Sequence, residues 1–288
     1  MSENFTESFT TMKKITLILL LLLQISFLQA QTYQPGKLAS NNFYEIVPFE
    51  WVKDKIIIPV QINDHTYRFI FDTGAVLFIS SKIQQECGLD KKGSANISDA
   101  TANKQRNDLF TIPEVKINNI SFTNAKAVKS DFFDIYPANC FEVDGFIGSD
   151  FLTKMIVQFD LENRRLILTD QPERLSLQAK KSIKMNVDKA QGSPHIKINL
   201  AGGIREKVLF DSGSDDFFTL DQARFQKFSK TNKITTKDVI PVFGSFSMGA
   251  SGIIPPSSEK YMIRFAELNI GNHSIKNIIS DFTNPAGS

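Results

Sequence analysis

The alternation of apolar and polar positions repeats at two places in the chain. Residues 56–80 and 194–219 each contain an alternating segment, a short polar turn and a second apolar segment that ends in Asp. Alternation of this kind predicts a strand with one buried face, and two such segments around a short turn predict a hairpin. The turns are expected at Asn63-Asp64 and at Gly202-Gly203. Both stretches therefore predict the same unit, a β-hairpin that delivers an Asp at its end.

Further elements follow each Asp-bearing hairpin in the same order. Short helices are expected at residues 81–87 and 221–228, because Ser or Asp stands where each helix would be capped. Amphipathic strand-turn-strand patterns then occur at residues 113–122 and 266–275. Two independent matches in the same order indicate an internal duplication.

The composition and the spacing of turns favour a mainly β protein. The chain of 288 residues contains 25 Phe, is rich in Ile and Val, and has Gly and Pro scattered at intervals. The repeat divides it into a first unit at residues 43–170 and a second unit at residues 182–288. Residues 171–181 between them are polar and contain Pro172, which is typical of a linker.

The N-terminal segment predicts export. Met12-Lys13-Lys14 precedes the apolar run Ile15–Phe27, and Ala30 provides a small residue at the end of the segment. This run is short for a transmembrane helix, so residues 1–30 are interpreted as a secretory signal peptide, with a membrane anchor as the alternative. Acidic residues precede Met12, which is therefore an alternative start. We expect a periplasmic or extracellular protein with no stable membrane span after cleavage.

Charge and residue spacing argue against several function classes. The 33 Lys and Arg residues against 31 Asp and Glu give a net charge of +2, and no run of five like charges occurs, which disfavours nucleic-acid binding. The three His residues, His65, His195 and His273, have no metal-ligand spacing, so neither a metal nor another cofactor is expected. The two cysteines, Cys87 and Cys140, leave a disulfide and two free thiols as open alternatives.

The candidate chemistry lies in two short motifs, Asp72-Thr73-Gly74 and Asp211-Ser212-Gly213. Each motif follows an apolar strand and occupies the same place in the repeat. One such triplet alone would be an ordinary turn, because Asp and Gly are both turn formers. Two copies at matching places instead predict a pair of carboxyl groups, Asp72 and Asp211, between two related units.

Two carboxyl groups at hydrogen-bond distance share one proton, because like charges that close cannot both ionise. The ionised member can take a proton from a water molecule, while the protonated member donates a hydrogen bond to a substrate carbonyl. Gly74 and Gly213 allow the backbone to turn close to each carboxyl group. The hydroxyl groups of Thr73 and Ser212 can bond across the pair and lock both loops together.

These motifs, together with Asp144-Gly145-Phe146-Ile147-Gly148-Ser149-Asp150-Phe151-Leu152, resemble the pepsin/retropepsin-like aspartic protease superfamily. The chain is similar to secreted bacterial members with two lobes in one chain. The resemblance implies two related β-barrel lobes with a cleft between them, and Asp72 and Asp211 as catalytic residues. It also implies a peptide or protein substrate, a monomer, and flap hairpins, for which the candidates are residues 99–106 and 245–253.

Two expectations concern the second lobe and the function. By the spacing of the first unit, a hydrophobic-hydrophobic-Gly segment like Gly145–Gly148 is due beyond Phe282, and none follows there. The second lobe is therefore expected to be incomplete, with Phe43–Phe49 as a candidate replacement strand. The predicted function is an aspartic endopeptidase. The alternative is a peptide- or glycan-binding envelope protein that keeps the protease fold without turnover.

Overall fold

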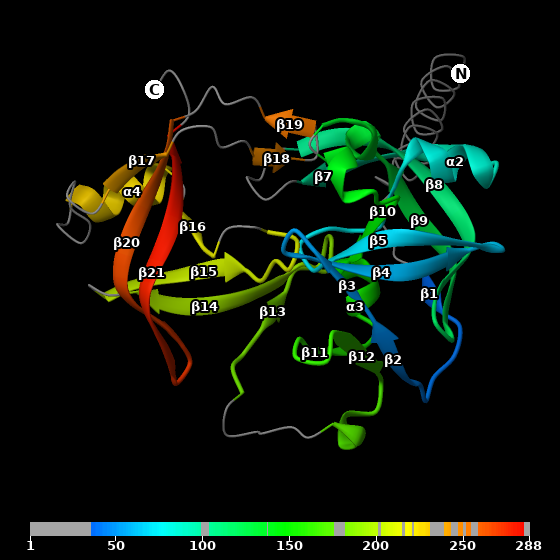
Figure 1. Cartoon of the computed structure of the whole chain (residues 1–288), viewed down its shortest axis with the longest axis horizontal. Helices are drawn as coiled ribbons and strands as arrows, with labels where there is room; N and C mark the ends of the chain where they lie inside the picture. The colour runs from blue at the N-terminus through cyan, green and yellow to red at the C-terminus, as the bar shows by residue number, and fades with distance from the viewer. Residues whose placement is uncertain are drawn as a thin grey trace, which may run out of the picture. The chain divides into compact units, whose positions relative to one another are not determined.

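The protein is described by a computed structural model (Figure 1). The described residues are 36–98, 104–136, 138–175, 182–200, 203–214, 217–220, 222–230, 239–242, 247–249, 252–254 and 259–284. The predicted signal peptide lies outside these ranges, as do part of the linker and the tips of both flap candidates.

A nine-stranded sheet dominates the first unit. Its strands are β1 (Lys37–Leu38), β3 (Glu50–Val52), β4 (Lys55–Ile62), β5 (His65–Asp72), β6 (Phe78–Ile79), β7 (Lys91–Ser98), β8 (Lys104–Ile117), β9 (Ile120–Lys129) and β10 (Gly145–Gly148). The pairing runs β9-β6-β10-β5-β4-β8, and β8 pairs back onto β9. Because the order returns to its starting strand, the sheet closes on itself as a barrel. The prediction of a mainly β protein is confirmed, and the closed sheet is consistent with the expected pepsin/retropepsin-like lobe.

The predicted hairpins and the first helix lie where the sequence places them. Strands β4 and β5 pair antiparallel around the turn at residues 63–64, and β8 and β9 pair around residues 118–119. Helix α2 (Ser81–Glu86) begins after Ser80, whose hydroxyl oxygen accepts the backbone N–H of Ile83. This N-cap satisfies one of the donors that the first turn of a helix leaves open.

Apolar side chains fill both sides of this sheet. One cluster includes Phe69, Phe71, Phe122 and Phe151, which are at most 1% exposed. A second cluster includes Val76, Phe132 and Phe133. It is covered by the short helices η1 (Asp131–Asp134) and η2 (Ala138–Phe141). Strand β5 contributes to both clusters, which is why its sequence is continuously apolar before Asp72.

The replacement-strand hypothesis for Phe43–Phe49 is wrong. Strand β2 (Tyr44–Pro48) pairs with β12 (Arg165–Thr169), which pairs with β11 (Ile156–Asp160), so β2 belongs to a small sheet of the first unit. The apolar side chains Phe43, Val47 and Phe49 are buried in the first core. Burial there gives this segment a partner within its own unit and leaves it unable to serve the second.

The second unit has its own sheet and its own core. Its strands are β13 (Asn186–Val187), β14 (Pro194–Leu200), β15 (Ile204–Leu209), β16 (Thr219–Leu220), β17 (Val239–Val242), β20 (Glu259–Ile270) and β21 (His273–Asn284). Helix α4 (Gln222–Lys230) corresponds to the predicted second helix. Strands β18 (Ser247–Gly249) and β19 (Gly252–Ile254) form a separate hairpin within the second flap candidate. The core includes Ile198, Leu200, Ile263 and Leu268.

The two main sheets differ at the position that β10 occupies in the first unit. In the first unit, β10 pairs with β5 on one side and with β6 on the other. In the described part of the second unit, β15 pairs with β14 and β16 pairs with β21, and no strand lies between β15 and β16. The strand pairing β16–β21 is parallel, as β6–β9 is, so the two units share this feature.

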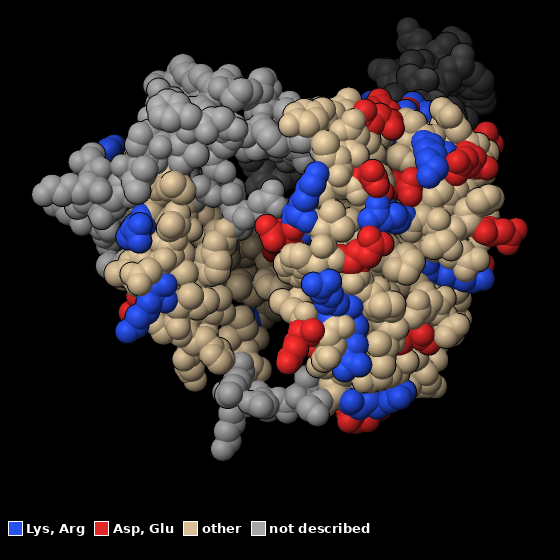
Figure 2. All heavy atoms as spheres, in the orientation of Figure 1, with Lys and Arg blue, Asp and Glu red and all other residues tan. Residues whose placement is uncertain are grey.

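The surface mixes charges of both signs. Figure 2 shows Lys and Arg side chains interspersed with Asp and Glu side chains on the viewed face, and several form ion pairs, among them Lys82–Asp144 at 2.9 Å.

Cys87 is half-buried and Cys140 is exposed, and both are free thiols. Among the described residues, no helix combines the length and the apolar character needed to span a membrane.

Candidate active site

Strand β5 positions the first acidic loop. Its residues Phe69, Ile70 and Phe71 are almost fully buried, and Asp72 is the last residue of the strand. Strand β10 runs parallel beside it, with Gly148 in register with Asp72. A side chain built on Gly148 would meet the backbone oxygens of Asp72 and Ala75, at distances below 3.0 Å that real side chains do not adopt. The Gly145–Gly148 segment of the nine-residue motif thus lies directly beneath the Asp72 loop.

The second acidic loop follows strand β15 in the same way. The backbone N–H of Phe210 donates to the carbonyl of Pro194 at 2.8 Å, which ties the end of the strand to the start of β14. Asp211 comes next, and its carboxylate accepts the N–H of Gly213 at 2.8 Å. The Asp72 carboxylate likewise accepts the N–H groups of Gly74 and Ala75, at 2.8 and 3.1 Å. Each loop therefore orients its own carboxylate through backbone donors.

Four hydrogen bonds join the two loops through Thr73 and Ser212. The Thr73 hydroxyl donates to the carbonyl of Phe210 at 2.5 Å and accepts the N–H of Ser212 at 2.9 Å. The Ser212 hydroxyl donates to the carbonyl of Phe71 at 2.8 Å and accepts the N–H of Thr73 at 3.1 Å. Each hydroxyl donates once and accepts once, so the connection has an approximate twofold symmetry and leaves neither group unsatisfied.

The two carboxyl groups lie against the opposite loops. A Cβ on Gly74 would lie 2.6 Å from an Asp211 carboxyl oxygen, and a Cβ on Gly213 would collide in the same way with Asp72. Any side chain at either glycine would occupy the space of a carboxyl group. Both Asp side chains are half-buried, so water can reach the pair. The structure thus brings together all six residues predicted from the motifs: Asp72, Thr73, Gly74, Asp211, Ser212 and Gly213.

Burial and the neighbouring Asp211 change the pKa of Asp72. Burial, the negative charge of Asp211 and a hydrogen bond with the Asp211 carboxyl group together raise the pKa of Asp72 from 3.8 to about 8. The N–H groups of Gly74 and Ala75 oppose this shift but do not cancel it. A carboxyl group with so high a pKa stays protonated at neutral pH and can donate a hydrogen bond. The pair is therefore set up to hold one shared proton.

The same shift links protonation to stability. Because the folded-state pKa of Asp72 lies above its unfolded-state pKa, the folded protein binds the proton more readily. The stabilisation is fully present below about pH 3.8 and is lost as the pH rises through about 8. Within that window, the free energy of unfolding falls by at most ~1.4 kcal/mol per pH unit on account of this group.

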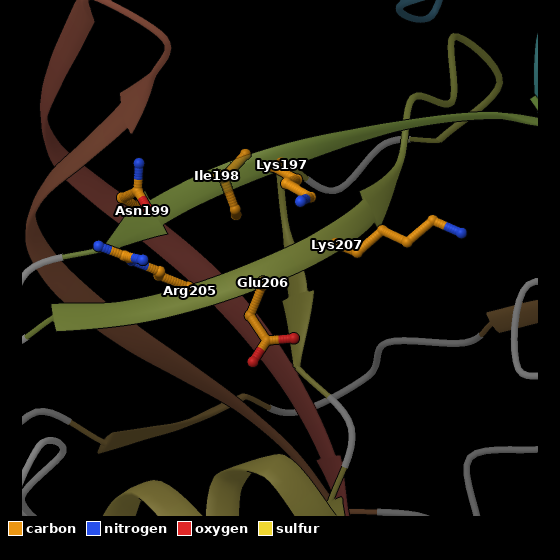
Figure 3. A pocket seen from close by; sticks show the side chains of 6 residues that line it. All are labelled: Lys197, Ile198, Asn199, Arg205, Glu206 and Lys207. Carbon is orange, nitrogen blue, oxygen red and sulfur yellow. The ribbon is translucent and has the colours of Figure 1, made fainter. Parts of the chain in front are cut away.

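The second unit contains a hollow that is separate from the two acidic loops. It is lined by Lys197, Ile198, Asn199, Arg205, Glu206 and Lys207 on strands β14 and β15 (Figure 3). Lys197 and Lys207 lie opposite each other in the strand register, and Glu206 pairs with Arg224 of α4 at 2.7 Å. No lining residue belongs to either acidic loop. No group of three or more His, Cys, Asp and Glu side chains suited to a metal occurs among the described residues.

The fold and the site together define a mainly β protein with two carboxyl groups held close together by two hydrogen-bonded loops. Residues 58–151, a third of the chain, match the family model described as aspartyl protease. The match includes the Asp72 loop and Gly145–Gly148 and ends before Asp211. It supports the superfamily resemblance for this segment, and with it a peptidase function in general terms.

Comparisons with whole proteins give weaker likenesses. A retropepsin-like aspartic protease from Rickettsia conorii shares 21% identity at a TM-score of 0.32, over 46% of this chain and 93% of that one. Basic 7S globulin from soybean shares 9% identity at a TM-score of 0.42, over 84% of this chain and 82% of that one. No curated protein matches the chain.

Proposed function

We propose that this protein is an aspartic endopeptidase in which Asp72 and Asp211 activate a water molecule held between them. The observation that carries the proposal is the joining of two separate Asp-bearing loops by reciprocal Thr73 and Ser212 hydrogen bonds. A protein that only binds peptides has no need for two acids forced together. The raised pKa of Asp72 supports the same proposal, because one member of the pair must carry a proton.

The reaction uses the pair in two roles. The ionised carboxyl group takes a proton from the water, whose oxygen attacks the peptide carbonyl carbon. The protonated carboxyl group donates a hydrogen bond to the carbonyl oxygen as negative charge develops there. The resulting tetrahedral species loses its amine after the nitrogen receives a proton from the pair. No cofactor takes part in this scheme.

The proposal extends to architecture and location. The corresponding order of β4–β5 and β8–β9 in the first unit, and β14–β15 and β20–β21 in the second, supports a duplicated monomer with two lobes and a cleft for an extended peptide.

We also propose that the protein is exported, on the strength of its N-terminal sequence, and that it is bacterial, as the resemblance to secreted bacterial members implies. Mass spectrometry of the protein isolated from its native cells should find a mature N-terminus at or near Gln31, because Ala30 offers a small residue for cleavage. Recovery of an intact segment from Met12 to Ala30 would instead support the membrane-anchored form.

The central test combines turnover with inhibitor binding. The full chain should cleave an unfolded polypeptide at mildly acidic pH, where the pair holds one proton. A peptide that carries a hydroxyl-bearing tetrahedral carbon in place of the scissile carbonyl should bind much more tightly than the matching substrate. At about 100 times its Kd, such a compound stabilises the folded state by ~2.7 kcal/mol, which thermal unfolding measures. Binding of plain peptides without cleavage would instead favour the non-catalytic alternative.

A further inference from the structure

A second connection between the two acidic loops runs through Ser149, the residue after Gly148. Ser149 opens the short helix α3 (Ser149–Leu152) and is completely buried. Its backbone N–H donates to the carbonyl of Ala75, in the Asp72 loop, at 2.7 Å. Its hydroxyl oxygen lies 2.8 Å from that same carbonyl and 2.8 Å from the carbonyl of Gln191, which belongs to the second unit.

The hydroxyl has one hydrogen for two carbonyl acceptors. The Ala75 carbonyl also accepts the N–H of Ser149, so it keeps a donor when the hydroxyl donates to the Gln191 carbonyl. Removing the hydroxyl removes this hydrogen bond between the two units. Ser149 therefore attaches the Asp72 loop to the segment around Gln191.

The segment around Gln191 is a tight turn held by the Asp188 side chain. The Asp188 carboxylate accepts the N–H groups of Ala190, Gln191 and Ser193, at 2.8, 2.9 and 2.6 Å. Although burial opposes it, this set of donors lowers the pKa of Asp188, so the carboxylate stays ionised and holds the turn. Gly192 has a φ of +80°, and a Cβ there would lie 2.9 Å from the Ser149 carbonyl oxygen. The turn is thus shaped to lie directly against α3.

The turn leads straight into the second acidic loop. Pro194 follows it, and the Pro194 carbonyl accepts the N–H of Phe210, the residue before Asp211. The Phe210 carbonyl in turn accepts the Thr73 hydroxyl. The hydrogen bonds therefore form a closed ring from the Asp72 loop through Ser149, the turn and Phe210, and back to the Asp72 loop.

We propose that Ser149 is a positioning residue that fixes the relative orientation of the Asp72 and Asp211 carboxyl groups. This inference rests on the proposed function. Four hydrogen bonds at Thr73 and Ser212 join the two loops at one place. Ser149 joins the Asp72 loop to the second unit at another place, and two separate attachments restrict tilting more than one does. Ser149 does not touch the reacting atoms and acts only through the two loops.

The test is Ser149→Ala in the full chain, with steady-state hydrolysis measured across pH. The expected result is a fall in kcat of about 10-fold or more with KM nearly unchanged, because misplaced catalytic groups slow the reaction while the substrate contacts remain. The upper pH limit of kcat/KM should also move to lower pH. Asp211 is the charged group that faces Asp72, and its raising effect on the Asp72 pKa weakens as the pair loosens.

Two further variants serve as a control and as an independent test of the same contact. Ser121→Ala removes a half-buried hydroxyl that donates to Glu114 on the β8–β9 hairpin, and it should change none of these quantities. Gly192→Ala disturbs the same contact from the side of the turn and should reproduce the Ser149→Ala effects. If Ser149→Ala does not fold, the same kinetic measurements are made on Gly192→Ala instead.

The outcomes separate this inference from the proposed function. If the wild type cleaves peptides and Ser149→Ala matches it in kcat and pH limit, the positioning role is overturned and the proposed function stands. If the wild type cleaves nothing, the pH dependence of unfolding decides instead. A fall in stability between acidic and neutral pH that shifts to lower pH in Ser149→Ala supports the positioning role, and an unchanged fall overturns it.

Discussion

Asp72→Asn should abolish peptide hydrolysis while the protein still folds. Asn keeps the shape of the side chain but can neither share a proton with Asp211 nor pass one to and from water. Loss of a positioned acid or base costs on the order of 10³-fold in rate, and the loss here is at least that large because the pair acts as a unit. Asp211→Asn should give the same loss. Initial rates of cleavage of an unfolded polypeptide measure both.

The same variant should change the pH dependence of stability. Asp72 binds its proton more tightly in the folded protein, so unfolding becomes easier as the pH rises from about 3.8 to about 8. Asn has no proton to lose, and it removes the repulsion between two half-buried carboxyl groups. Asp72→Asn should therefore flatten this part of the stability curve, and its free energy of unfolding near pH 8 should equal or exceed that of the wild type.

A matched control uses another Asp of the first unit. Asp64 lies exposed in the turn between β4 and β5, and Asp64→Asn makes the same chemical change away from the loops. It should keep the wild-type rate and pH dependence. Turnover that persists in Asp72→Asn would remove Asp72 from the mechanism, whatever the distance between the two acids.

Local features of this fold could be predicted from the sequence because their contacts are local. The β4–β5 and β8–β9 hairpins are set by alternation and a two-residue turn, and α2 is set by the Ser80 cap. The loops carrying Asp72 and Asp211 could be matched to each other because the repeat places both after an apolar strand. The internal repeat thus allowed the contact between the Asp72 and Asp211 loops to be predicted, although the two loops are far apart in the sequence.

Contacts without such a repeat could not be predicted. The assignment of Phe43–Phe49 failed because its apolar pattern suits any sheet. Its partner strand β12 is far away in the sequence, and the Thr169 hydroxyl there donates to the Phe43 carbonyl, 126 residues away. Ser149 was missed for a similar reason. Its partner is a backbone carbonyl, that of Gln191, which any residue type can provide. The only available signal was the Asp188 and Gly192 pair, which predicts a tight turn but not what the turn contacts.

The largest effect on stability should come from Gly148→Ala. Gly148 lies in register with Asp72 on the neighbouring parallel strand, and an added Cβ would collide with the backbone oxygens of Asp72 and Ala75. Backbone atoms cannot move aside as a flexible side chain can, so either β10 or the Asp72 loop must shift. Overpacking of this kind typically costs ~1–3 kcal/mol, and the rigid neighbours here place the expected loss at about 3 kcal/mol or more. Urea unfolding measures it.

Gly203→Ala separates this collision from the general cost of replacing Gly. Gly203 has a φ of +72° with no atom within 4 Å of an added Cβ, so its replacement adds only backbone strain, on the order of 1 kcal/mol. Hydrolysis should survive in Gly203→Ala and be lost in Gly148→Ala, because only the latter displaces the loop that carries Asp72. If Gly148→Ala were as stable and as active as Gly203→Ala, β10 would not lie beneath the Asp72 loop. The proposed close contact between the Gly145–Gly148 segment and the Asp72 loop would then be wrong.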